Sequence, residues 1–211
     1  MDRIRIISLD LEGTLVTPEF SRYVWHEGIP VMYARRNKIS VDRAKEAVKR
    51  QYDEVGDGQR EWYDINYWFR RFELENHHEL LAGYQDRVTV YPEVRGLLRN
   101  ISEKYRIIVA TGSSSEFIPY LLKDIGGLVS RIFSSISDYG TLKTPEFYCG
   151  ICRELRVESN EIVHIGDSRL YDYLSPREAG ICSFHLDRDG TGEYADSLFS
   201  LSELESVLKQ I

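Results

Sequence analysis

Short apolar segments rich in β-branched residues alternate with helical patterns along most of this chain. Each segment is bounded by Gly, Ser or Asp, as expected of strands that are buried on both faces. Five segments fit this description: Ile4–Asp10, Arg106–Thr111, Ile132–Ser135, Glu161–Gly166 and Ile181–Leu186. Strands that alternate with helices predict an α/β fold, a doubly wound parallel sheet with right-handed crossovers.

The predicted helices lie between these strands and after the last one. Proline near a helix start and glycine after its end support several of their boundaries. The predicted helices are Glu93–Lys104, Ser114–Asp124, Thr144–Arg156, Tyr173–Ala179 and Ser202–Gln210.

The alternation is interrupted after the first strand. Residues 17–90 contain helical patterns and no convincing strand. Ser40 is suited to N-cap one helix, and the aromatic-rich segment Arg60–Leu81 predicts another. We therefore expect an α/β core domain made of residues 1–16 and 91–211, with residues 17–90 inserted as a helical cap domain.

Composition narrows the classes of function. The chain has 211 residues, of which 42% are hydrophobic and 12% aromatic, and this predicts a folded globular protein. A formal charge of -7 argues against nucleic-acid binding as its main role. No segment approaches the roughly 20 apolar residues that span a bilayer, so we expect no membrane partner. A monomer or small homo-oligomer is expected.

The cysteines and the N-terminus predict a cytoplasmic location. Three cysteines do not make a disulfide framework, and the first residues lead directly into a strand without a signal-peptide pattern. Cys149 and Cys152 have the spacing of a redox or metal pair, but they fall within a predicted helix and no second pair is present. Core packing is predicted for both.

The first predicted strand ends in two acids one residue apart, Asp10 and Glu12, followed by Gly13. Because side chains alternate along a strand, both carboxyl groups can point into one mouth beyond its end. Two such groups can divide the roles of nucleophile and proton donor around a bound cation. A buried strand that ends in a solvated acidic turn gives the same pattern, so both interpretations stay open.

The second strand is followed by Thr111, Gly112 and Ser113. Ligands of open α/β sheets bind beyond the carboxyl ends of the strands, where these residues lie. A hydroxyl and free backbone amides at a helix entrance are suited to phosphate oxygens. The same residues are also suited to a plain helix N-cap.

Charged residues mark two further loops. Lys143 precedes the helix predicted from Thr144, where it could neutralise a carboxylate nucleophile and a bound phosphoryl group or simply be solvated. Asp167 and Asp172 follow the fourth strand, and their carboxylates could complete an oxygen-ligand site for Mg²⁺. Helix capping by Asp167 and Ser168 is the alternative.

These four segments, in this order, resemble the motifs of the haloacid dehalogenase superfamily. They are Asp-x-Glu-Gly-Thr at 10–14, Thr-Gly-Ser at 111–113, Lys-x-Pro at 143–145 and Gly-Asp-Ser-x-x-x-Asp at 166–172. The last segment is similar to that of the phosphoglycolate-phosphatase-like group, and the helical insertion resembles a cap placed between the first and second motifs. The resemblance implies a Mg²⁺-dependent phosphatase that acts on a small phosphorylated metabolite.

The resemblance also implies roles for the acidic residues. Asp10 is the implied nucleophile, which forms an aspartyl-phosphate intermediate. The implied metal ligands are the Asp10 carboxylate, the Glu12 backbone carbonyl and Asp167. Asp172 supports the metal or orients Lys143.

The implied phosphate-binding residues are the Thr111 hydroxyl, the amides of Gly112 and Ser113, and the Lys143 ammonium group. Thr111 and Lys143 are thereby also candidate catalytic residues. Phosphoryl transfer requires mainly an in-line nucleophile and a clamp for the charged oxygens, which this set would supply.

Glu12 departs from the resemblance, because most phosphatases of the superfamily carry Asp at this position. The implied metal contact is made by the backbone, and proton transfer needs only a carboxyl group. Dehalogenases of the superfamily have Tyr there, which this chain does not match, and a 2-haloacid dehalogenase is kept as the alternative within the same class. A catalytically impaired regulatory or binding module is a third possibility, against which the intact set of Asp10, Thr111, Lys143 and Asp167 speaks.

The residues that contact the rest of the substrate are harder to predict. Phe20, Arg22 and Tyr23 lie just past the first motif, and Arg70 and Arg71 belong to the aromatic segment. Each is a plausible cleft residue, and the arginines could meet an anionic group. Most of the aromatic series is predicted to form the core of the cap.

Overall fold

Five parallel strands form one sheet in the order β3-β2-β1-β4-β5 in the computed structural model, which describes residues 4–194 and 197–209. The strands are β1 (Ile6–Leu9), β2 (Arg106–Thr111), β3 (Arg131–Ser134), β4 (Ile162–Gly166) and β5 (Cys182–His185). All five predicted strands are confirmed, and with them the doubly wound α/β fold. β1 is central, so its carboxyl end lies between those of β2 and β4.

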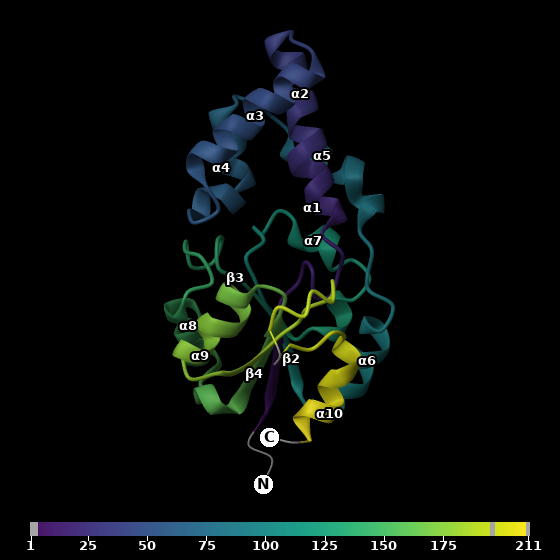
Figure 1. The fold of residues 1–211 in the computed structure, drawn as a ribbon, viewed down its shortest axis with the longest axis vertical. Coiled ribbons are helices and arrows are strands. Elements are labelled where there is room, and N and C mark those ends of the chain that lie inside the picture. The colour runs from purple at the N-terminus through teal and green to yellow at the C-terminus, as the bar shows by residue number, and fades with distance from the viewer. Residues whose placement is uncertain (1–3, 195–196, 210–211) are drawn as a thin grey trace.

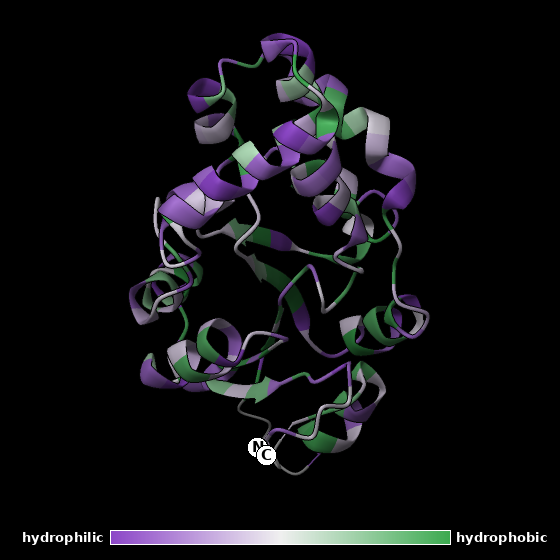
Figure 2. Cartoon of the chain, turned by 45° about the horizontal axis from the view of Figure 1, so that its top comes forward, coloured by the Kyte–Doolittle hydropathy of each residue, from purple (hydrophilic) through white to green (hydrophobic). Residues whose placement is uncertain are grey.

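Helices cover both faces of the sheet. Alternate residues of β1 supply two apolar clusters, because Ile7 and Leu9 face one side and Ile6 the other. The helices that follow or flank the sheet are α6 (Val94–Ser102), α7 (Ile118–Leu121), α8 (Pro145–Leu155), α9 (Ser175–Glu178) and α10 (Leu204–Leu208). Apolar residues of α6, α7 and α10 join one cluster and those of α8 join the other. Figure 2 shows hydrophobic strands enclosed by helices with hydrophilic outer surfaces.

A group of helices lies beyond the carboxyl ends of the strands (Figure 1). It consists of α1 (Glu19–Tyr23), α2 (Ile29–Asn37), α3 (Val41–Val55), α4 (Ile65–Arg71) and α5 (His77–Tyr84). A π-helical segment, Val24–Gly28, joins α1 to α2. Ser40 caps α3 as predicted, since its Oγ accepts a hydrogen bond of 3.4 Å from the amide of Arg43.

The single helix predicted over Arg60–Leu81 is wrong. The segment is divided into a short 3₁₀ turn, α4 and α5. Asp64 begins α4 by accepting a hydrogen bond of 2.8 Å from the amide of Asn66, so it acts as an N-cap rather than an interior residue. The chain then leaves the helix through Glu73 and Asn76, which have φ of 51° and 62°. Residues with left-handed backbone end a helix.

The helix predicted over Ser114–Asp124 is also largely wrong, because only Ile118–Leu121 is α-helical. Polar contacts with the end of β3 hold the preceding loop: Ser134 Oγ donates to the carbonyl of Ser113 at 2.8 Å, and Ser115 N donates to Ser137 Oγ at 2.8 Å. The helix predicted from Tyr173 begins earlier, as a π-helical segment Arg169–Leu174 that continues into α9.

The remaining helical predictions differ from the structure mainly at their ends. α6, α8 and α10 lie within the predicted ranges, and Gln210 lies outside the described residues. Core packing is wrong for Cys149, which is exposed, whereas Cys152 is half-buried and packs against the cluster that contains Ile6; both are free thiols. Within the part of the chain that the structure describes, no helix has the length and apolar character needed to cross a membrane.

Candidate active site

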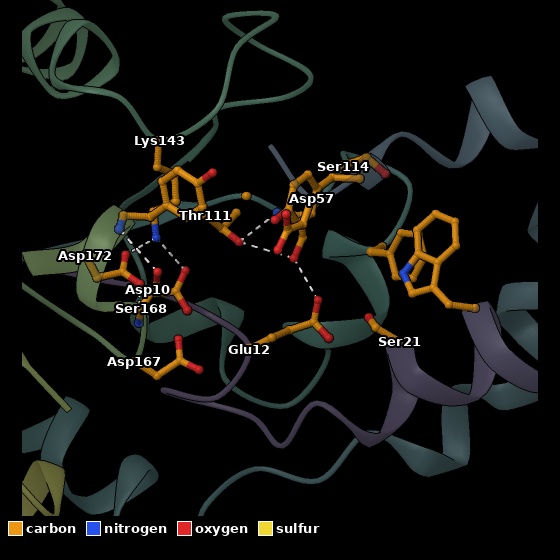
Figure 3. Close-up of a pocket in the computed structure, with 16 residues that line it drawn as sticks. Asp10, Glu12, Ser21, Asp57, Thr111, Ser114, Lys143, Asp167, Ser168 and Asp172 are labelled. Atoms are coloured by element: carbon orange, nitrogen blue, oxygen red, sulfur yellow. Dashed lines mark hydrogen bonds and ion pairs between the residues drawn. The ribbon is translucent and has the colours of Figure 1, made fainter. Parts of the chain in front are cut away.

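The predicted site residues meet in one cavity of about 370 Å³ beyond the carboxyl edge of the sheet (Figure 3). β1, β2 and β4 end side by side there, which is why loops far apart in sequence contribute to it. The cavity is lined by Asp10, Glu12, Ser21, Trp25, Asp57, Tyr63, Thr111, Gly112, Ser113, Ser114, Phe117, Lys143, Asp167, Ser168, Tyr171 and Asp172. All eight residues predicted from the motifs are among them.

A buried lysine joins two of the acids. Lys143 Nζ donates a hydrogen bond of 2.7 Å to Asp10 Oδ1 and also contacts Asp172 Oδ1. Lys143 is only 5% exposed, so of the two interpretations left open by the sequence the structure has the lysine at the strand end and not in solvent. One buried ammonium group thus faces two buried carboxyl groups, so it offsets only part of their negative charge when both are ionised.

The two carboxyl groups that contact Lys143 have pKa values shifted in opposite directions. Burial raises the pKa of Asp10 to about 7, and Lys143 only partly opposes this effect. Burial acts in the same direction on Asp172, but the Lys143 charge and a hydrogen bond from His164 outweigh it and hold the pKa of Asp172 well below its usual range. For Lys143 itself, burial opposes but the two carboxylates prevail, and they raise its pKa. Asp172 thus stays ionised and keeps Lys143 charged.

Three residues that the sequence analysis did not identify form a buried network of polar contacts next to Asp172. His164 Nε2 lies 2.9 Å from Asp172 Oδ1, and its Nδ1 lies 2.8 Å from Ser8 Oγ. The Tyr148 hydroxyl lies 3.1 Å from His164 Nε2. Burial lowers the pKa of His164, so the ring is neutral, and with its proton on Nε2 it donates to Asp172 and accepts from Ser8. One indication of this role is present in the sequence, since His164 is the one polar residue in an otherwise apolar strand.

Replacing Lys143 by Met is expected to destabilise the metal-free protein by ~3–5 kcal/mol at pH 8, because two buried carboxylates lose their counter-charge. The loss should shrink at lower pH, where protons neutralise Asp10. Urea unfolding of the wild type and of Lys143→Met at pH 6 and pH 8 measures the difference. A change below ~1 kcal/mol at pH 8 would contradict this account of the ion network.

A third acid completes a cluster that has the character of a cation site. Carboxylate oxygens of Asp10, Asp167 and Asp172 lie within 4.8 Å of one another. The pKa of Asp167 is raised, first by loss of surrounding water and then by the charges of Asp10 and Asp172, although its side chain is exposed to the cavity. Oxygen ligands with unbalanced negative charge are what Mg²⁺ prefers, so the residues present fit this metal.

Two glycines make room for these acids. A Cβ on Gly13 would lie 2.0 Å from Asp167 Oδ2, and one on Gly166 would lie 2.4 Å from Asp172 Cγ. Gly13 also has φ of +79°, which L side chains rarely adopt. Gly13 thus lets the loop after β1 lie close to the Asp167 side chain, and Gly166 leaves room for the Asp172 side chain within the loop after β4.

The second acid of the first motif is placed apart from the other three. Glu12 Oε2 accepts a hydrogen bond of 2.8 Å from Ser113 Oγ, whereas Oε1 is buried and has no hydrogen-bond partner among the described residues. Burial raises the pKa of Glu12, which favours its protonated form. Asp10 and Glu12 therefore lie in different surroundings, and Glu12 has one carboxyl oxygen available for a ligand (Figure 3).

The loop after β2 lines the cavity, but not as a helix entrance. Thr111 Oγ1 accepts a hydrogen bond of 3.0 Å from Ser113 N and lies 3.2 Å from Ser113 Oγ. The nearest helix, α7, starts only at Ile118, so the expected helix-dipole contribution to anion binding is absent here. Ser114 Oγ is buried without a partner among the described residues and lines the cavity, which the sequence analysis did not anticipate.

None of the five cleft residues suggested by the sequence lines this cavity. Phe20 is fully buried, and Arg71 is hydrogen-bonded to Gln51 and Glu54 on α3. Arg22 and Arg70 are exposed, and Tyr23 stacks on Tyr84. Ser21 of α1 and Trp25 of the following π-helical segment line the cavity instead, since residues four apart in a continuous helical run share a face.

Comparison with known families identifies the class of protein. A model of the haloacid dehalogenase-like hydrolases matches residues 4–180, and the chain belongs to this family. The predicted superfamily membership is therefore confirmed.

Individual relatives are more distant. The GMP/IMP nucleotidase YrfG of Escherichia coli is 29% identical over 69 residues, and the match spans 33% of this chain and 31% of the nucleotidase. A HAD phosphatase from Thermococcus onnurineus superposes with a TM-score of 0.85 at 23% identity, over 97% of this chain and 98% of the other. A 2-haloacid dehalogenase from Pseudomonas syringae superposes with a TM-score of 0.70 at 19% identity, over 98% of this chain and 99% of the dehalogenase. At these identities the two structures show the fold alone.

Proposed function

We propose that this hydrolase is a Mg²⁺-dependent phosphatase that cleaves a small phosphorylated metabolite through an aspartyl-phosphate on Asp10. The observation that carries the proposal is the joint placement of Asp10, Lys143 and Glu12 in one cavity. Asp10 is bonded to a buried cation, and Glu12 presents a carboxyl oxygen that no other group uses. A nucleophile, a charge-neutralising group and a proton donor are the parts that covalent phosphoryl transfer requires.

In the first step, an Asp10 carboxylate oxygen attacks phosphorus and the bond from phosphorus to the leaving oxygen breaks. Glu12 gives its proton to that oxygen, so the product leaves as an alcohol. In the second step, Glu12 takes a proton from water as the water oxygen attacks the aspartyl-phosphate. The bond from phosphorus to Asp10 then breaks, which releases phosphate and restores both carboxyl groups.

Mg²⁺ would be held by the carboxylates of Asp10 and Asp167 and the backbone carbonyl of Glu12, with Asp172 close by. When bound, it would offset negative charge on the phosphoryl oxygens. Thr111, the amides of Gly112 and Ser113, and Lys143 would hold the same oxygens. We also propose that residues 17–90 act as a cap domain over residues 1–16 and 91–211, since α1 and the π-helical segment after it supply Ser21 and Trp25 to the cavity. Such closure would exclude bulk water from the reaction.

The placement of Glu12 favours a phosphatase over a dehalogenase. An alcohol leaving group requires a proton, whereas a halide leaves without one. A buried carboxyl group with a raised pKa and an unused oxygen serves the first reaction and has no evident use in the second. The ordered contacts between Lys143, Asp10 and Asp172 also speak against a catalytically impaired module.

Hydrolysis of p-nitrophenyl phosphate with Mg²⁺, and again after chelation, tests the proposal. We expect turnover that depends on the metal and is absent from the Asp10→Asn variant. Chloride release from a 2-haloacid in parallel would instead support dehalogenation. Turnover of neither substrate class would favour a binding module.

Binding of Mg²⁺ is expected to raise the melting temperature more at pH 8 than at pH 6. The pKa of Asp10 is raised to about 7, so below this pH a proton must be displaced before the metal binds. The apparent affinity should fall by up to ~10-fold per pH unit below 7 for each displaced proton. A thermal-shift titration measures this, with Asp167→Asn as the variant that should lose the response. An equal response at both pH values would contradict the assignment of Asp10 as a ligand.

A further inference from the structure

A second cavity of about 310 Å³ adjoins the candidate active site on the side of the helical group. Glu12, Ser21, Trp25, Tyr63 and Asp167 line both cavities. The added walls are His26, Tyr52 and Trp62, with Pro18 at the edge. We name the space between Trp25, His26, Tyr52, Trp62 and Tyr63 the aromatic chamber.

The walls of the aromatic chamber are held by ring contacts. Tyr52 lies edge-on to Trp25 at 6.2 Å between centroids and 5.8 Å from Trp62, and Trp25 stacks on Phe117 at 5.4 Å. The Tyr52 hydroxyl donates to the carbonyl of Trp25 at 3.2 Å, so its polar atom is already paired. Fixed aromatic faces with paired polar groups favour a flat, apolar ligand group, which stacks on them without desolvating a charge.

Charge around the two cavities disfavours a second anion. Lys143 is the sole lysine or arginine among the described residues that line them, and it is already bonded to two carboxylates. Lys45 and Lys49 line an adjoining cavity on the far side of the chamber walls. Each is already paired with an acid, Glu27 and Asp53 respectively. Burial, helped by the charge of Arg22, lowers the pKa of His26, so this ring is neutral near pH 7. Asp57 adds a further acid at the cavity wall (Figure 3). A carboxylate or second phosphate on the leaving group would meet negative charge without a counter-ion.

Unpaired polar atoms lie where the two cavities adjoin. Ser21 Oγ and Glu12 Oε1 are both buried and make no hydrogen bond of normal geometry among the described residues. The two side chains are near each other, because Ser21 lowers the pKa of Glu12 against the larger, opposing effect of burial. Buried polar atoms without partners are rare in folded proteins, and a ligand hydroxyl between the phosphate and the ring would bridge these two. The cavity thus offers, in order, a place for phosphate, a polar linker and a flat ring.

We infer that the substrate is a phosphate monoester whose leaving group is an uncharged alcohol carrying an aromatic ring, and that the ring occupies the aromatic chamber. This inference rests on the proposed phosphatase function. Two sources share the chemistry: a nucleoside 5′-monophosphate, with a sugar between ring and phosphate, and a simpler arylalkyl phosphate. Phosphoglycolate, which has an anionic leaving group, is predicted to be a poor substrate.

Four substrates separate these outcomes: guanosine 5′-monophosphate, benzyl phosphate, ribose 5-phosphate and phosphoglycolate. We expect kcat/KM for at least one ring-bearing ester to exceed that for ribose 5-phosphate by ~10-fold or more, and phosphoglycolate to rank last. The better of the two ring-bearing esters identifies the source of the ring. Equal values with and without the ring, or a preference for phosphoglycolate, would overturn the inference.

Two variants localise the effect. Trp62→Ala and Tyr63→Ala each remove a chamber wall and should lower kcat/KM for the ring-bearing esters by roughly 5- to 100-fold. The ratio of these values to kcat/KM for ribose 5-phosphate should fall in both variants. Tyr33→Ala is the matched control, because Tyr33 is a partly buried aromatic residue of the same helical group that packs on Phe72 away from both cavities. Equal losses on all four substrates would contradict a role in ring recognition.

A binding measurement separates this inference from the proposed function. Guanosine and benzyl alcohol should quench the fluorescence of Trp25 and Trp62 in the Asp10→Asn variant, whereas ribose should not. Quenching without any Mg²⁺-dependent hydrolysis would overturn the phosphatase and retain the ring site. Absence of quenching by both ring compounds, together with hydrolysis of ribose 5-phosphate, would overturn the ring site and retain the phosphatase.

Discussion

The Asp10→Asn variant is expected to hydrolyse phosphate monoesters ~10⁴-fold or more slowly than the wild type, because an amide is not a nucleophile in this reaction. The variant should still fold. Burial already raises the pKa of Asp10 to about 7, so the carboxylate is poorly solvated there, and Asn has nearly the same shape. Asp172 remains to neutralise Lys143. Steady-state kinetics and melting temperatures of both proteins measure the two effects.

The matched control is Asp53→Asn, the same chemical change at an exposed acid of α3 that is bonded to Lys49. It should leave kcat and KM unchanged. Acid quenching of the wild type during turnover should also give a phosphorylated peptide that contains Asp10, which Asp10→Asn should lack. Retention of more than a tenth of the wild-type rate by Asp10→Asn would identify water, not Asp10, as the nucleophile.

Much of the core could be predicted because its signals are local. β1 and β4 are short apolar runs that end where polar residues begin, and buried parallel strands require just that pattern. The acids at 10 and 167 follow these strand ends directly. Their proximity in space follows from the rule that parallel strands present their carboxyl ends at one edge.

The helical group could not be predicted as well, because its boundaries depend on tertiary contacts. Pro30 lies inside the helical run from α1 to α2, where sequence alone indicates a break, yet a π-helical segment accommodates it. Likewise, Arg60–Leu81 has the pattern of one helix, but Asp64 N-caps α4 and the left-handed residues Glu73 and Asn76 separate α4 from α5. Glu73 gives no sequence signal for such a turn.

The residues around the reacting groups show the same limit. Trp25, Asp57 and Tyr63 come from three separate segments of the helical group and meet only in the folded chain. The role of His164 could not be predicted for another reason. It lies within β4, where a sequence pattern predicts only which face of the sheet a side chain occupies. Its contact with Asp172 depends on a π-helical segment for which the sequence has no clear pattern.

The Glu12→Gln variant is expected to lower kcat for an alkyl phosphate by ~10²–10⁴-fold, the usual contribution of a general acid and base. Gln keeps the hydrogen bond from Ser113 Oγ, so the loss would report the missing proton rather than a displaced loop. The effect on the first step should be much smaller with p-nitrophenyl phosphate, whose leaving group departs without a proton. An initial burst of nitrophenolate followed by slow turnover is therefore expected from the variant.

The dependence of this effect on pH has a defined sign. Burial raises the pKa of Glu12, so the acid form persists to higher pH than in a free glutamate, and kcat should decline as pH rises past that raised value. Glu12→Gln should lose this decline because its amide does not titrate. Glu12→Asp is the informative companion, since it keeps a carboxyl group but shortens the side chain away from Ser113. If wild type and Glu12→Gln had the same pH profile and similar kcat on an alkyl phosphate, the proton would have to come from another group, and the unpaired oxygen of Glu12 would need a different explanation.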